Sequence, residues 1–159
     1  MRTVETDAEG NVSITVEQNK ANGTQTRREY SLDAKGNLTL TGLETGASAI
    51  KIPATVTADG ETYEVTKITK NALRNNDQLE KVVLGKNITA IGKNAFRGVA
   101  KLSEIVIGAN LASVSKNAFK GIAEGAVFKI KADKKTYKKI VELLKKSGLD
   151  AGVIFKRVK

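Results

Sequence analysis

Three short acidic sequences are the first candidates for chemistry in this chain, because Asp beside glycine can place carboxylate oxygens around a metal ion. They are DAEGN (residues 7–11), DAKGN (33–37) and TADGE (57–61). None of them continues to the later carboxylate that a calcium-binding EF-hand loop requires. We therefore interpret all three as turns and expect no metal site.

Catalytic groups are equally sparse. The sequence GKNITAIGK (85–93) does not have the spacing of a phosphate-binding P-loop, since its glycines stand seven residues apart and no Ser or Thr follows the second lysine. The chain has no histidine and no cysteine, which removes the usual general base, the usual zinc ligand and thiolate chemistry. Because the carboxylates are scattered along the chain, we expect a protein that is not an enzyme and needs no cofactor.

The charge is concentrated at one end of the chain. The net charge is +10, and residues 129–159 carry 11 Lys or Arg against 3 Asp or Glu. Six of these lysines would crowd the polar side of one predicted helix: Lys134, Lys135, Lys138, Lys139, Lys145 and Lys146. Such a cluster could hold an acidic polysaccharide, and the alternative is a solvated face that keeps the protein soluble. Nucleic acid is the least favoured partner, because basic and aromatic residues do not interleave in one strip.

The elements that position these residues follow from a 23-residue repeat. KNAFRG (93–98) recurs as KNAFKG (116–121), and the same shift aligns apolar residues in units that begin at about 65, 88 and 111. The aligned sets include Ala72, Ala95 and Ala118, then Leu73, Phe96 and Phe119, then Val82, Ile105 and Phe128. A single unit has apolar residues on every side of its loop and cannot bury them alone, whereas coils stacked at about 4.8 Å can. The sequence therefore predicts a repeat solenoid with short parallel strands.

The segment LSEIVIGANLASVSKNAF (102–119) resembles the BspA-like leucine-rich repeat of surface and secreted proteins from anaerobic commensal bacteria. Proline, which often follows the first strand in that family, occurs here only as Pro53, and no Cys or small residue follows the Ala-Phe pair. The resemblance implies a right-handed, β-rich leucine-rich-repeat coil and a place at the cell surface or outside the cell. Since no apolar run can span a membrane or form a signal peptide, we expect no membrane insertion and interpret the chain as a mature fragment.

We expect three segments. The repeats occupy residues 42–132, where Asp59-Gly60 predicts a hairpin insert over 57–65 in the opening copy. Residues 133–159 resemble the terminal helix and closing strand of such arrays, with an apolar stripe that would cover the last coil. Residues 1–41 alternate between polar and apolar types and predict a small β hairpin or meander that protects the first coil.

A binding role follows from the solenoid, because stacked coils present one continuous repeated face. The outward strand positions that we select as a candidate site are Lys51, Lys81, Val83, Glu104, Val106, Val127 and Lys129. This stripe has no Tyr or Trp to anchor a partner, so an ordinary solvated sheet face is an equal alternative. The resemblance implies an adhesion module that binds a host or bacterial surface protein or glycan. A structural spacer, or polyanion binding through the lysine-rich helix, is the alternative function.

Overall fold

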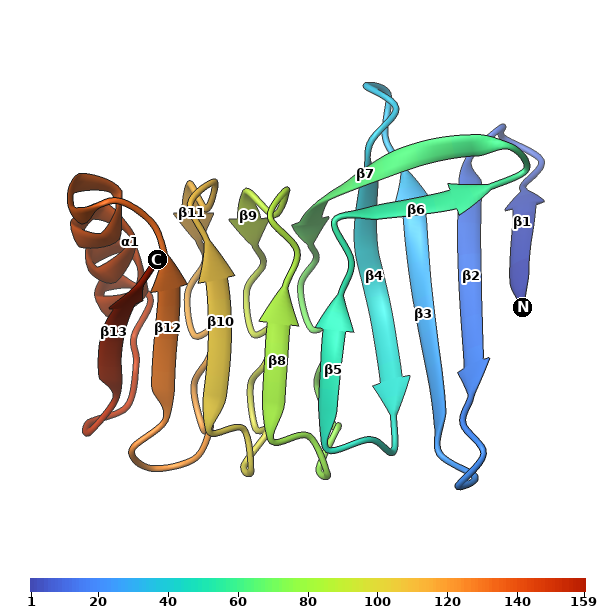
Figure 1. Ribbon diagram of the computed structural model, residues 1–159. Helices are drawn as coiled ribbons and strands as arrows, with labels where there is room; N and C mark the ends of the chain where they lie inside the picture. Colours follow the sequence, from blue (N-terminus) through green and yellow to red (C-terminus); the bar gives the residue numbers. More distant parts are fainter.

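The computed structural model describes residues 1–159, and the 23-residue period appears in it as a parallel β-sheet that runs through the repeats (Figure 1). Its strands are, in spatial order, β5 (Ala49–Ile52), β8 (Lys81–Leu84), β10 (Glu104–Gly108), β12 (Val127–Lys131) and β13 (Ile154–Val158). Ile105 pairs with Val82 on one side and with Phe128 on the other. The expectation of a β-rich repeat fold with short parallel strands is confirmed.

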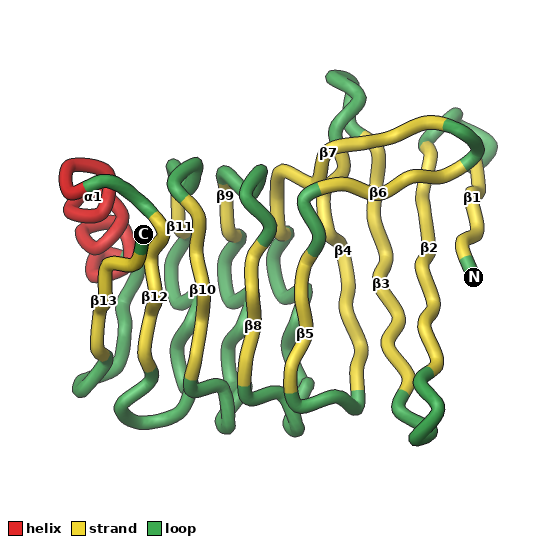
Figure 2. Tube along the Cα trace, in the orientation of Figure 1, coloured by secondary structure: helices red, strands yellow, loops and turns green.

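A second set of parallel strands returns each coil behind the first sheet (Figure 2). It consists of β7 (Glu61–Ile68), β9 (Ala90–Ile91) and β11 (Ser113–Val114). The core lies between the two sheets, and there Phe96 and Phe119 are fully buried with stacked rings whose centroids are 4.8 Å apart. The repeated KNAF sequence therefore places one phenylalanine directly on the next.

The asparagine of each KNAF or KNAL sequence occupies a left-handed backbone conformation. Asn71, Asn94 and Asn117 have φ angles of 61°, 58° and 59°, a region that asparagine tolerates better than most side chains do. The backbone N–H of Asn71 donates to Lys93 O, and that of Asn94 donates to Lys116 O. Each turn is thus hydrogen-bonded to the turn of the next coil, which explains why the polar residues of the phrase recur together with the apolar ones.

The N-terminal residues form an antiparallel meander of β1 (Arg2–Thr6), β2 (Val12–Asn19), β3 (Gln25–Leu32) and β4 (Leu38–Thr45). Strand β4 extends past residue 41, and it pairs in parallel with β7 of the first coil. Asn76 strengthens this junction, since its buried amide donates to Leu43 O and Leu73 O and accepts from the N–H of Thr45. The meander therefore continues a sheet of the coil.

Between β5 and the rest of the first coil, the chain makes a hairpin of β6 (Thr55–Ala58) and β7. Asp59 and Gly60 form its turn with φ angles of 53° and 78°, which is the geometry of a two-residue hairpin loop. Figure 1 shows the hairpin crossing over β2, β3 and β4, and β6 reaches β1. It crosses the meander near one end of the meander strands (Figure 1).

The chain ends in helix α1 (Lys134–Lys146) and strand β13, beside the last coil (Figure 1). Asp133 accepts a hydrogen bond from the N–H of Thr136 at the helix N-terminus, while Ile140 and Leu144 are buried. After the helix, Ser147 O accepts from the N–H of Asn117, and the Asp150 carboxylate accepts from the N–H of Gly121 at 2.7 Å. These two acceptors stand where the carbonyls of a further coil would be. No helix in the structure has the length and apolar character needed to cross a membrane.

Candidate functional site

The seven strand residues selected from the sequence all lie on the outer surface of the parallel sheet, which we call the strand face. In register across β5, β8, β10, β12 and β13, its first row is Ala49, Lys81, Glu104, Val127 and Ile154, and its second row is Lys51, Val83, Val106, Lys129 and Lys156. The residues between these positions point into the core, because side chains alternate along a strand. The strand face is thus a continuous surface assembled from residues up to 107 positions apart, from Ala49 to Lys156.

Charged groups in the middle of the strand face neutralise one another. Lys81 Nζ lies 2.8 Å from one carboxylate oxygen of Glu104, and Lys129 Nζ contacts the other oxygen. Hydrogen bonds from Lys129 and then Lys81 hold the pKa of the Glu104 carboxyl below its usual value. These three residues form a partnered cluster, whereas the exposed Lys51 and Lys156 have no ion-pair partner at the two edges of the face.

The apolar members of the strand face differ in how much surface they offer. Val106 is only 8 % exposed, because Val83 and Lys129 flank it in the neighbouring strands and the Glu104 cluster lies beside it. Val83 and Val127 are half-buried, and Ile154 on the last strand is 46 % exposed. Val106 is therefore part of the packed floor of the face, and the sequence could not show this because exposure depends on the neighbouring strands.

The second candidate surface, the lysine surface of α1, is fully accessible. Lys134, Lys135, Lys138, Lys139, Lys145 and Lys146 are all exposed, on the side of the helix away from Ile140 and Leu144. None of the ion pairs in the structure involves these lysines. Helical spacing also places Glu142 among them, three or four residues from four of the six lysines, a neutralising charge that the sequence reasoning missed. Lys145 differs from the others, since its Nζ lies 5.9 Å from the centre of the Phe155 ring.

The calcium-like sequences are turns in the structure, as expected. Asp7 Oδ1 accepts from the N–H groups of Glu9 and Asn11, and Asp33 Oδ1 accepts from those of Lys35 and Asn37. These backbone hydrogen bonds hold the pKa of Asp33 below its usual value. The pKa of Asp7 is also lowered, and the largest cause is a hydrogen bond from the side-chain amide of Asn11. The carboxylates of Asp7 and Asp33 therefore close their own loops, and no three His, Cys, Asp or Glu side chains gather in the molecule.

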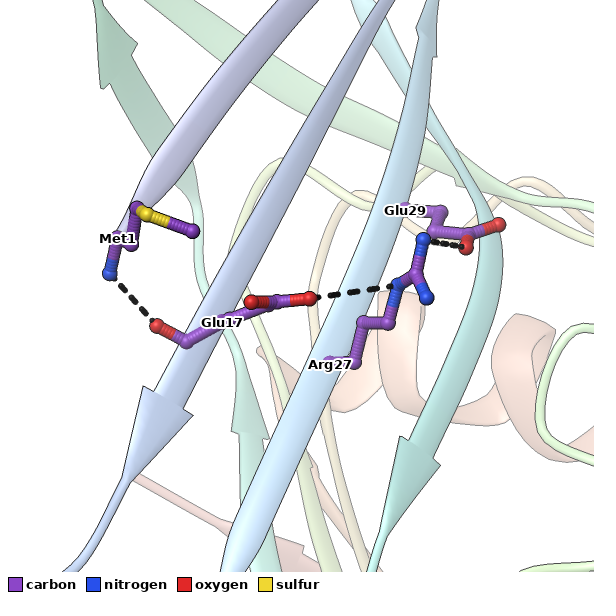
Figure 3. Close-up of polar contacts among 4 residues, drawn as sticks. All are labelled: Met1, Glu17, Arg27 and Glu29. Carbon is purple, nitrogen blue, oxygen red and sulfur yellow. Dashed lines mark hydrogen bonds and ion pairs between the residues drawn. The ribbon is translucent and has the colours of Figure 1, made fainter.

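Two neighbouring arginines of β3, Arg27 and Arg28, were not selected from the sequence and have opposite surroundings. On the outer side, Arg27 lies 3.0 Å from Glu29 and 3.9 Å from Glu17, whose backbone carbonyl also accepts from the Met1 amino group (Figure 3). On the inner side, Arg28 is 8 % exposed and contacts no carboxylate. The alternation of Thr26, Arg28 and Tyr30, all buried, is the sequence signal that could have placed Arg28 inward.

One solved structure shares this fold at low sequence identity, and two others overlap with it less well. A leucine-rich repeat protein from Bacteroides capillosus superposes with a TM-score of 0.61 at 22 % identity, covering 89 % of this chain and 98 % of its own. A leucine-rich repeat protein from Bacteroides ovatus has a TM-score of 0.49 and a sequence identity of 21 %, and the match covers 65 % of this chain and 36 % of that protein. A leucine-rich cell surface protein from Faecalibacterium prausnitzii has a TM-score of 0.44 and a sequence identity of 22 %, and the match covers 72 % of this chain and 26 % of that protein.

No curated protein matches the chain. The model of the BspA type leucine-rich repeat region matches residues 47–139 in six copies, which is more than half of the chain. The resemblance inferred from the KNAF repeats is confirmed, and the chain belongs to the BspA-type leucine-rich repeat family.

Proposed function

We propose that this chain is a non-enzymatic protein-interaction module that binds a surface protein or glycan through its strand face. The observation that carries the proposal is the unbroken register of the sheet, which sets half-buried Val83 and Val127 and exposed Ile154 among lysines. Protein interfaces combine apolar and polar contacts, and here the apolar side chains lie beside the neutralised cluster of Lys81, Glu104 and Lys129. The free Lys51 and Lys156 at the edges would steer an acidic partner, since the central lysines are neutralised by Glu104.

The experiment that tests this function compares two double variants in which lysines are replaced by glutamate. Saturable binding of the protein to immobilised mucin and to a matrix protein would be measured for the wild type, for Lys51→Glu with Lys156→Glu, and for Lys134→Glu with Lys135→Glu. Both variants change the net charge equally and alter only exposed side chains. We expect the strand-face pair to weaken binding by about fivefold or more and the helix pair to leave it unchanged. No saturable binding to either surface would favour the spacer function.

We also propose a role for the C-terminal segment of the array and a location for the protein. We propose that the coil is right-handed and that α1 and β13 cap its C-terminal end. The capping role is supported by Ser147 O and the Asp150 carboxylate, which accept hydrogen bonds from the last coil. A place at the bacterial cell surface or outside the cell is proposed from the family resemblance. Recovery of the protein from intact cells by mild surface proteolysis would test that location, and protection from the protease would contradict it.

Polyanion binding through α1 is the second candidate function, because six exposed lysines there have no carboxylate partner within ion-pair distance. Retention on an anionic polysaccharide column across a salt series would test it. Lys134→Glu, Lys135→Glu, Lys138→Glu and Lys139→Glu combined should elute at clearly lower salt than the wild type. The matched control carries Lys20→Glu, Lys35→Glu, Lys70→Glu and Lys101→Glu, and equal elution of the two variants would remove the helix from consideration.

A further inference from the structure

The inner side of the N-terminal meander contains a cavity of about 290 Å³ that the proposed function does not use. It lies between the meander, strand β5 and the start of β6. Its polar lining comes from Arg2, Gln18, Arg28, Tyr30, Lys51 and Thr55, and neither Asp nor Glu lines it. The cavity is thus surrounded by three cationic side chains and no anionic one.

Arg28 is the most deeply placed of these cations. In β3 it alternates with Tyr30, and the two side chains are 8 % and 1 % exposed. Its guanidinium donates to Gln18 Oε1 at 2.6 Å and to Lys51 O at 3.0 Å. A guanidinium has five N–H donors, so these bonds leave most of its donors free. The buried Nε of Arg28 and the buried hydroxyl of Tyr30 have no hydrogen-bond partner in the protein.

A buried cation without a counter-charge is costly, because it loses hydration that neutral acceptors replace only in part. Burial accordingly lowers the pKa of Arg28 and raises the pKa of Tyr30 to about 12. Tyr30 therefore keeps its proton at physiological pH and can act as a hydrogen-bond donor. Arg27, one residue earlier on the same strand, is by contrast paired with Glu29 and Glu17 (Figure 3).

We propose that this cavity binds the oxyanion group, a carboxylate or a sulfate, of a small ligand about the size of an acidic monosaccharide. A guanidinium presents parallel N–H groups that match the two oxygens of such a group, and the Tyr30 hydroxyl adds a third donor. The exposed Arg2 and Lys51 at the rim attract anions toward the opening. The cavity volume is at the small end of the range for ligand pockets, which excludes a long chain from its interior. The site does not depend on the strand face being a binding surface.

The test is a titration of the full chain, followed by calorimetry or NMR, with glucuronate, inorganic sulfate and glucose. We expect saturable one-to-one binding of at least one of the two anions and none of glucose, which differs from glucuronate by lacking the carboxylate. If only sulfate binds, the recognised group is the sulfate, and if only glucuronate binds, it is the carboxylate of the sugar acid. Absence of saturable binding by either anion overturns the proposal.

Three variants locate the site. Tyr30→Phe removes a hydroxyl that has no protein partner, so the melting temperature of the free protein should not fall, while anion affinity should drop about tenfold. Arg28→Gln should abolish binding. Arg27→Gln changes the net charge by the same amount as Arg28→Gln, but on the outer side of the strand, and should leave anion affinity unchanged. Anion binding that Tyr30→Phe and Arg28→Gln do not weaken would place the anion elsewhere, for example on the lysines of α1, and would overturn the proposal.

Discussion

Replacing Phe96 by alanine should remove a large part of the stability of the whole array. Phe96 is fully buried, and its ring stacks on that of Phe119 with the ring centres 4.8 Å apart. Phe119 in turn meets Phe128 in a T-shaped arrangement with the ring centres 5.0 Å apart. Truncating a buried phenylalanine costs about 3–5 kcal/mol, against a total stability of about 5–15 kcal/mol for a typical domain. With a urea m-value of about 2 kcal/mol/M, the unfolding midpoint should fall by about 1.5–2.5 M.

Phe96→Leu is the matched control for this prediction, because Leu73 occupies the equivalent buried position one coil earlier. It should cost clearly less than alanine, since leucine fills most of the same space. A double-mutant cycle with Phe119→Leu should give a coupling of about 0.5–1.5 kcal/mol for the stacked pair. Fluorescence and circular dichroism must report the same transition, as repeat arrays can lose cooperativity. A midpoint shift below about 0.5 M for Phe96→Ala would refute the stacked interior.

Two further perturbations test the C-terminal segment and the strand face. Deleting residues 133–159 should expose Phe128 and Ile130 and leave the N–H groups of Asn117 and Gly121 without acceptors. The truncated protein should therefore have a lower melting temperature and self-associate, as measured by light scattering. A monomer with an unchanged melting temperature would contradict a capping role. Because the pKa of Glu104 lies below its usual 4.5 in the folded protein, its stabilising effect is complete above that pH and is lost as pH falls through the folded value. Thermal melts should therefore show the wild type losing more stability than Glu104→Gln on acidification below about pH 4.5, and parallel curves would count against the cluster.

The sequence predicted the repeats well because a fixed period relates residues that must lie side by side. Val82, Ile105 and Phe128 could be aligned without knowing the fold, and their pairing follows from stacking alone. The parallel pairing of β4 with β7 could not be predicted, since it joins a non-repeating strand to the first coil and leaves no periodic trace. Strand β1 lies in the segment predicted to form a β hairpin or meander, but its bounds could not be predicted, because its short and mostly exposed sequence has little apolar pattern.

The candidate sites were predictable to a smaller extent. All seven strand residues share one face, as the alternation of the strands requires. The neutralisation of Glu104 involves Lys129 on a diagonal between strands, and a one-dimensional alignment does not bring that pair together. Arg28 was overlooked because arginine is normally assigned to solvent, although its position in β3 has the phase of buried Tyr30.

The hydrogen bonds between successive KNAF turns have a consequence for how this molecule can change size. Asn71 donates to the second coil and Asn94 donates to the third in the same way, so each coil meets its neighbour through an interchangeable joint. A duplication of one whole 23-residue unit would insert a coil without altering either terminal segment, and would lengthen the body by about 4.8 Å, the spacing between strands. Genetic gain or loss of whole units would therefore change the length of the molecule in fixed steps. The meander at one end and α1 with β13 at the other would keep their present contacts.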